Sequence, residues 1–156
     1  MKEFHRRRLP HIEAGERPVF VTFCTDKRLV IPESVRSIVL AACVHSHRTR
    51  FHMHGAIVMP DHVHLVLTPI LKESEDPYSI SEIMQGIKSS SAHTLNKALK
   101  RSGKLWQEES FDRVIRNVEV VREKVEYVCL NPVRAGLVLN EDQYPWLWRE
   151  WIDDVE

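Results

Sequence analysis

The chain has 156 residues, in which 22 lysines and arginines balance 22 aspartates and glutamates, and it contains nine histidines. A chain of this length buries about two-thirds of its unfolded surface in a single domain, so folding requires neither disulfides nor a structural metal. Its longest apolar run, Ile38 to Val44, has seven residues, whereas a membrane-spanning helix needs about 20. The sequence therefore predicts one folded domain and excludes a transmembrane helix.

The spacing of cysteines and glycines excludes several common kinds of site. Cys24, Cys43 and Cys129 are far apart and lie among apolar neighbours, which is typical of buried thiols in a reducing cytosol. The nearest two glycines, Gly86 and Gly103, are 17 residues apart, so the chain has neither a dinucleotide-binding fingerprint nor a phosphate-binding loop. Because the basic N-terminus lacks the apolar segment of a signal peptide, we expect a cytoplasmic protein.

Apolar spacing predicts a strand, a helix and a hairpin in the first half of the chain. Alternating β-branched and aromatic residues indicate a strand over residues 18–24. A proline opens an amphipathic helix over residues 32–47. Residues 51–59 and 62–67 are predicted to pair as a hairpin whose turn is Pro60-Asp61.

The second half of the chain predicts two helices and a further strand. Ser79 or Ser81 caps a long helix that runs to about residue 99, and residues 105–111 are predicted to form a strand. Asn117 caps a last helix that ends near Asn131, because Pro132 cannot continue it.

These elements predict a single α+β domain with a mostly antiparallel sheet and flanking helices. Its core spans about residues 19–138, and residues 139–156 form an acidic tail rich in tryptophan. We expect the tryptophans of the tail to clamp onto the domain rather than to form a ligand platform; they are Trp146, Trp148 and Trp151.

The strongest local signal for chemistry is His62-Val63-His64 in the predicted hairpin. Residues i and i+2 of a strand point to the same face, so the two imidazoles project together while Val63 and Leu65 enter the core. Paired imidazoles are a good bidentate site for a divalent metal. The alternative is that both histidines are structural, either exposed or hydrogen-bonded.

Two other histidine pairs share this spacing. His45 and His47 lie in a predicted helix, where residues two apart point to different faces. His52 and His54 lie on the neighbouring strand and can in principle be the metal pair or extend it. No proline-acid turn orients them, so we expect them to be structural.

A tyrosine in the last predicted helix faces away from the apolar stripe of that helix. The stripe consists of valines at positions 118, 121, 125 and 128, and at 100° per residue Tyr127 lies about 140° from its centre. Asn131 follows one turn later. A surface tyrosine is the alternative, but a phenol oxygen beside a metal can also act as a covalent nucleophile.

Five short motifs occur in the order seen in REP-associated tyrosine transposases, and residues 19–138 resemble this family. Its members are single-tyrosine HUH endonucleases, related to small insertion-sequence transposases. The motifs are Met59-Pro-Asp-His-Val-His-Leu65, Ile87-Lys-Ser89, Leu105-Trp-Gln107, Phe111-Asp-Arg113 and Tyr127-Val-Cys-Leu-Asn-Pro-Val-Arg-Ala-Gly-Leu137. The last block is the most specific of them.

The resemblance implies a ferredoxin-like α+β domain with the histidine pair on its central sheet. By this resemblance His62 and His64 match the HUH histidines, Tyr127 the nucleophile and Asn131 a third, amide ligand of the metal. The metal would be Mg²⁺ or Mn²⁺. The implied reaction is cleavage and rejoining of DNA through a covalent 5′-phosphotyrosine.

The family also implies a substrate and a location. Substrates are single-stranded DNA hairpins from repetitive palindromes, and we expect a nucleoid-associated protein that is a monomer or a homodimer. Although net charge is zero, residues 79–104 carry five basic residues and one acid. We therefore hypothesise phosphate contacts in and beyond this stretch, at Lys88, Lys97, Arg113 and Arg116.

Three other functions account for part of the sequence. A histidine-triad hydrolase needs a third histidine where this chain has Val66, so it is largely excluded. A retired transposase that only binds DNA stays open. A phosphohydrolase that uses water would leave Tyr127 without a role.

Overall fold

The computed structural model of the chain describes residues 17–116 and 118–151. Within these residues a five-stranded sheet has the order β4-β1-β3-β2-β5, and every neighbouring pair is antiparallel. The strands are β1 (Val19–Cys24), β2 (Phe51–Val58), β3 (His62–Pro69), β4 (Phe111–Val114) and β5 (Leu147–Arg149). The α-helices are α2 (Arg36–Val44), α3 (Ile80–Leu99), α4 (Val118–Cys129) and α5 (Asn131–Arg134), with 3₁₀ turns at Asp26–Arg28, Glu33–Val35 and Glu141–Gln143.

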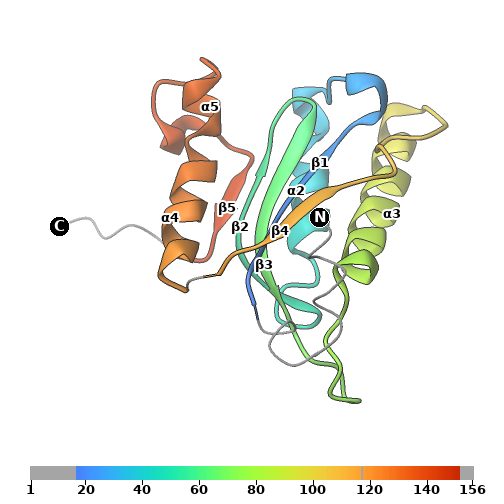
Figure 1. The fold of residues 1–156 in the computed structure, drawn as a ribbon. Coiled ribbons are helices and arrows are strands. Elements are labelled where there is room, and N and C mark those ends of the chain that lie inside the picture. The colour runs from blue at the N-terminus through green and yellow to red at the C-terminus, as the bar shows by residue number, and fades with distance from the viewer. Residues whose placement is uncertain (1–16, 117, 152–156) are drawn as a thin grey trace.

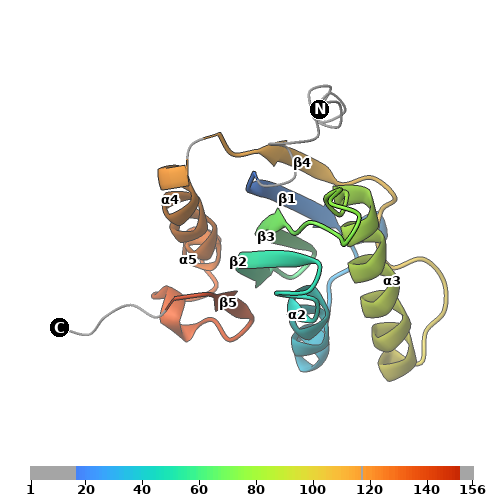
Figure 2. The same cartoon turned by 90° about the horizontal axis from the view of Figure 1, so that it is seen from below.

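The predicted ferredoxin-like α+β fold is confirmed. The succession β1-α2-β2-β3-α3-β4, with α2 and α3 on one face of the sheet, is the ferredoxin-like arrangement (Figure 1). β5 extends this sheet beside β2, and α4 covers the opposite face (Figure 2). No helix in the described part of the chain is long and apolar enough to cross a membrane.

The sheet separates two apolar cores. Alternate residues of β1 and β3, among them Val21, Val63 and Leu65, pack with α2 and α3 in the larger core. The residues between them face α4, where Phe20 and Val66 pack in the smaller core. Most residues on both faces of the central strands are therefore buried, whereas the histidines, together with Thr22, Cys24 and Thr68, are partly buried.

Helix α3 begins where the sequence predicts. The Ser79 hydroxyl accepts from the Glu82 amide at 3.0 Å, and the Glu82 carboxylate accepts from the Ser79 amide at 3.0 Å. This reciprocal capping box satisfies two donors at the start of the helix. Ser91 in the middle of α3 is buried, and its hydroxyl donates to the Ile87 carbonyl, so the run of serines does not break the helix.

The predicted strand at residues 105–111 is wrong. Trp106 forms only an isolated bridge to Thr25, and the strand begins at Phe111. The segment before β4 is held by side chains instead, because the Trp106 indole packs on Phe23 and donates to the Ser91 hydroxyl at 2.9 Å. Trp106 is therefore buried because its side chain fixes this segment to the core, and not because the segment belongs to the sheet.

The tryptophans of the tail pack onto the domain, as predicted. Trp146 contacts both cores, Trp148 the larger one and Trp151 the smaller one. Strand β5 was not predicted, since three residues are too few to show a period. The expected cap at Asn117 lies outside the described residues.

Helix α4 approaches the sheet closely at Gly55. A Cβ atom on this residue would lie 2.7 Å from Cγ1 of Val125. We expect Gly55→Ala to destabilise the fold by about 1–3 kcal/mol, because either Val125 or the helix must move. Chemical denaturation measures the free energy of unfolding.

The matched control is Gly86→Ala in helix α3, where the added Cβ would meet only a nitrogen of the Arg50 side chain, at 3.6 Å. We expect it to be neutral or to stabilise by about 0.5–1 kcal/mol. Adding Val125→Ala to Gly55→Ala should show a favourable coupling, because it removes the clashing methyl groups. Equal effects of the two glycine substitutions would contradict the close packing of α4.

Candidate functional site

His62 and His64 lie side by side on the α4 face of β3, as the alternation predicts. Their ring centroids are 4.9 Å apart. His62 Nδ1 lies 2.8 Å from Asp61 Oδ1, and His64 Nδ1 lies 2.8 Å from the Thr22 hydroxyl. When each Nδ1 carries its proton to these acceptors, each Nε2 presents a lone pair. Imidazoles that hold a metal are oriented by such a bond on the other nitrogen.

Asp61 connects the histidine pair to the turn before β3. Burial opposes its ionisation, but hydrogen bonds from Arg28 and His62 hold the pKa of the Asp61 carboxyl below its usual value. The Arg28 Nε–Asp61 Oδ2 distance is 3.0 Å. An ionised carboxylate only accepts hydrogen bonds, so it fixes the proton of His62 on Nδ1.

His64 is kept neutral by its surroundings. Burial lowers the pKa of His64 to about 4, and the charges of His62, Lys124 and Arg134 add to the effect. A neutral imidazole is the form that binds a metal. His64 therefore offers a neutral imidazole to a metal at any pH well above 4.

Phe20 links the histidines to helix α4. Its ring stacks on the His64 ring, with centroids 5.5 Å apart and planes inclined by 19°. Lys124 Nζ lies 4.2 Å from the centroid of Phe20 and 5.1 Å from that of Tyr127. Arg113 lies opposite Phe20 in the β1–β4 register, with its guanidinium 6.0 Å from the same ring. Tyr127 is thus separated from His64 by one aromatic ring and one ammonium group.

Tyr127 is exposed and surrounded by cations. Its side chain lies on the outward side of α4 with 57% of the residue exposed. The Arg134 guanidinium covers its ring at 4.0 Å and donates to the Tyr127 carbonyl at 2.9 Å. The same guanidinium donates to Asn131 Oδ1 at 3.0 Å, so Tyr127 and Asn131 belong to one cluster. The predicted stripe is confirmed at Val125 and Val128, which are buried, and at Val121, which packs partly buried against the smaller core. The side chain of Val118 lies outside the described residues.

A second group of ligand-type side chains lies elsewhere on the sheet. His52, His54 and Glu150 bring their donor atoms within 4.8 Å of one another, an arrangement that can hold a metal ion. Local spacing predicts a structural role for the two histidines and does not point to Glu150. A link between β2 and a residue almost 100 positions later is invisible in local spacing.

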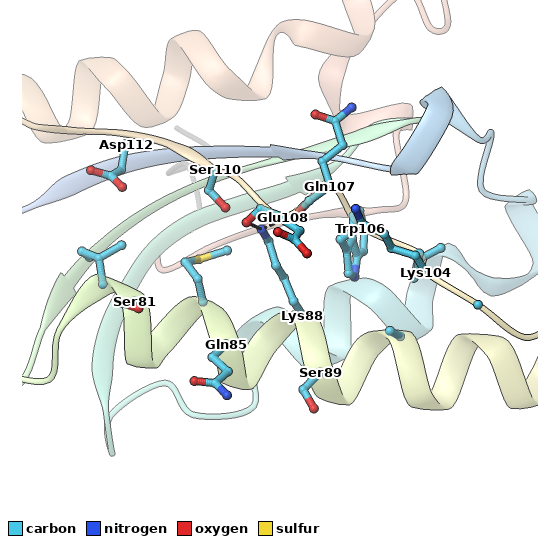
Figure 3. Close-up of a pocket in the computed structure, with 15 residues that line it drawn as sticks. Ser81, Gln85, Lys88, Ser89, Lys104, Trp106, Gln107, Glu108, Ser110 and Asp112 are labelled. Carbon is cyan, nitrogen blue, oxygen red and sulfur yellow. Dashed lines mark hydrogen bonds between the residues drawn. The ribbon is translucent and has the colours of Figure 1, made fainter.

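The residues predicted to contact DNA fall on different parts of the molecule. Arg113 lies beside Phe20, and Arg116 is exposed just beyond β4. Lys97 is exposed on α3, on the opposite face of the sheet from α4. Lys88 points from α3 toward the segment before β4, where its ammonium donates to the carbonyls of Gln107 and Glu108 at 2.9 and 3.1 Å (Figure 3).

Lys88 borders a cleft of about 780 Å³ between α3 and residues 103–112. Burial lowers the pKa of the Lys88 ammonium, and two of its three N–H groups are engaged by carbonyls. This lysine therefore ties the segment before β4 to α3. The cleft is lined in part by Ser81, Gln85 and Ser110, and it lies away from Tyr127.

Five residues of the site were not predicted from the sequence: Phe20, Thr22, Arg28, Lys124 and Arg134. Phe20 and Thr22 do share one face of a predicted strand, but the strand pairing that places them against His64 is not local. Lys124 and Arg134 do lie near Tyr127 in the sequence, one turn before it and seven residues after it. Positive charge near a candidate nucleophile is the signal that would have found them.

The neutral state of His64 makes the stability of the metal-free protein depend on pH. Since the folded pKa is about 4 and the ordinary value is 6.5, the unfolded chain binds more protons between these values. The contribution is therefore complete above about pH 6.5 and is lost as the pH falls toward 4.

We expect the stability of the wild type relative to His64→Gln to rise by about 1–3 kcal/mol between pH 4 and 7. Urea unfolding of both proteins at several pH values measures this difference. A difference that is independent of pH would contradict a buried, neutral His64. Comparing the variants cancels the contributions of the other histidines.

Several known proteins that resemble this chain are REP-associated tyrosine transposases. A REP-associated tyrosine transposase of Escherichia coli is 30% identical over 95 residues, which are 61% of this chain and 52% of that protein. The chain spans about half the length of the curated relatives that it matches. A solved structure of a REP-associated tyrosine transposase bound to a REP hairpin has a TM-score of 0.66 and 22% identity, covering 91% of this chain and 88% of that one.

The sequence model of the family described as "Transposase IS200 like" matches residues 19–128. The matched segment contains all of β1 to β4, the histidine pair and Tyr127. The chain therefore belongs to the IS200-like transposase family, whose members process DNA.

Proposed function

We propose that the protein is a metal-dependent endonuclease and strand transferase for single-stranded DNA, with Tyr127 as its nucleophile. The observation that supports this most is an exposed tyrosine flanked by Lys124 and Arg134, which the Lys124 ammonium and the Phe20 ring connect to a pair of oriented histidines. The chain contains three tyrosines. Tyr144 is buried, with its hydroxyl donating to the Val58 carbonyl at 2.6 Å, and Tyr78 lies on the α3 side of the sheet.

His62, His64 and Asn131 offer two imidazole nitrogens and one amide oxygen, and the positions left for phosphate and water oxygens suit Mg²⁺ or Mn²⁺. His62 and His64 each have Nδ1 engaged and Nε2 available, and the Asn131 oxygen has a second lone pair besides the one that accepts from Arg134. We propose these three residues as the ligands. When bound, the metal would polarise an oxygen of the scissile phosphate.

In the proposed reaction the Tyr127 oxygen attacks phosphorus in line and loses its proton. The bond from phosphorus to the 3′ oxygen breaks, and that oxygen leaves as a hydroxyl after gaining a proton. The DNA 5′ end stays on Tyr127 as a phosphodiester, so a later 3′-hydroxyl can reverse the step and join a new strand. Lys124 and Arg134 stabilise negative charge at the phosphate and the phenol oxygen.

The solved relative binds a REP hairpin, and we propose that single-stranded hairpins from repeated palindromes are also the substrate here. We propose that the protein acts in the cytoplasm on nucleoid DNA. Because Lys124 lies against both the Phe20 ring and the Tyr127 ring of the same chain, a monomer can supply the whole site, although a homodimer is compatible with it.

The first experiment incubates the full chain with single-stranded hairpins from repeats near its gene, together with Mg²⁺ or Mn²⁺. Denaturing gels should show a covalent protein–DNA band with the wild type. Tyr127→Phe should lose this band completely while binding the hairpin as before, and a chelator should also abolish it. Tyr144→Phe is the poorer control because its hydroxyl is structural, so Tyr78→Phe is the matched one and should keep the band.

Other outcomes lead to other functions. Cleavage without a covalent band that persists in Tyr127→Phe would indicate a nuclease that uses water. Binding with neither cleavage nor a covalent band would indicate a DNA-binding protein that has lost its activity.

The electrostatic part of the proposal predicts that Lys124 contributes more to hairpin binding than Lys97 does. Lys124→Gln should weaken hairpin binding by about tenfold and reduce the slope of log affinity against log salt by about 0.7, as expected for one lost contact to single-stranded DNA. Lys97→Gln removes the same charge on the opposite face of the sheet. A larger effect at Lys97 would place the DNA along α3 instead of along α4.

A further inference from the structure

Three side chains with metal-binding atoms converge at the end of the sheet away from His62. His52 and His54 belong to β2, and Glu150 directly follows β5. The His52 Nε2–Glu150 Oε1 distance is 2.6 Å, and the His54 Nδ1–Glu150 Oε2 distance is 2.7 Å. One carboxylate thus faces two imidazole nitrogens that come from a different strand.

A hydrogen bond on the nitrogen that faces away from Glu150 fixes the orientation of the His54 ring. Its Nε2 lies 2.8 Å from the Thr68 hydroxyl. When Nε2–H donates to that hydroxyl, Nδ1 directs its lone pair toward Glu150. An imidazole held by a hydrogen bond on its outer nitrogen is the usual arrangement around a bound metal.

This group is separate from the His62–His64 pair. His54 contacts Thr68, which is four residues beyond His64 on β3, or about 13 Å along a strand. A single ion cannot be shared over that distance, because bonds from zinc to nitrogen or oxygen are about 2.1 Å long. A metal here would leave the proposed site at Tyr127 unchanged.

We propose that His52, His54 and Glu150 form a second metal site that binds Zn²⁺, with water as the fourth ligand. Two imidazole nitrogens and one carboxylate oxygen are ligands that zinc prefers. In a tetrahedral site the ligand atoms are about 3.4 Å apart, so the two distances from the imidazoles to the carboxylate have to widen by less than 1 Å within a group whose donor atoms already lie within 4.8 Å of one another. The side chains of His52 and Glu150 are 42% and 29% exposed, and this leaves them room to do so.

The role of this ion would be to attach the tail to the domain. β5 has only three residues, and the Glu150 amide donates to the His54 carbonyl at 3.1 Å. A bridge from Glu150 to β2 fixes the same connection through side chains. Zinc that binds only when the tail is in place stabilises that state by mass action.

The test counts zinc ions bound to the full chain, freed of metal with a chelator and then titrated with Zn²⁺ in excess Mg²⁺. The wild type is expected to bind one more Zn²⁺ per chain than Glu150→Gln, which keeps the shape of the side chain but loses its charge. Its melting temperature should rise by about 5 °C with Zn²⁺, and hydrogen exchange at residues 147–150 should slow. Thr68→Val, which removes the bond behind His54, should weaken this site by about 10- to 100-fold.

Equal zinc stoichiometry in the wild type and Glu150→Gln would overturn the proposal and leave a metal-free cluster of hydrogen bonds. If Glu150→Gln does not fold, His52→Asn at the more exposed position serves instead, with the same expectation. His62→Asn is the matched control and should leave the additional site intact. This count does not involve DNA, so it stands or falls independently of the proposed cleavage reaction.

Discussion

Side chains alternate across β3, so burying Val63 and Leu65 against α2 and α3 forces His62 and His64 onto the opposite face. A shift of one residue in the pairing of this strand would exchange the two sets and place both imidazoles in the larger core. The register with β1 brings Thr22 opposite His64. The same alternation puts Phe20 beside them, so the packing of the core also determines the geometry of the site.

Helix α4 contributes the proposed nucleophile, Tyr127, to the face of the sheet that carries the histidines. Its buried valines pack on the face that carries the histidines, and Gly55 lets the helix come close enough for Val125 to touch the strand backbone. Tyr127 points away from that contact and remains exposed. Helices α2 and α3 complete the fold from the other side, which separates the part of the molecule that stabilises it from the part proposed to act on DNA.

The sequence allowed prediction of features that depend on neighbours along the chain. The capping box at Ser79, the hairpin around Pro60-Asp61 and the outward direction of Tyr127 follow from local spacing. Features that depend on distant pairing were missed, such as the bond from Thr22 to His64 and the approach of Glu150 to β2. The strand predicted from residue 105 was wrong because the burial of Trp106 comes from its indole packing on Phe23, and not from a ladder. The catalytic roles came from the family resemblance and the DNA contacts from the distribution of charge, and both stay predictions.

The central claim is that one tyrosine of the three carries the DNA 5′ end. Protease digestion of the wild-type covalent complex, followed by mass spectrometry, identifies the residue to which the nucleotide is attached. Our account predicts a phosphodiester on the peptide that contains Tyr127 and on no other. Attachment at Tyr78 or Tyr144, or at a residue of another type, would contradict it.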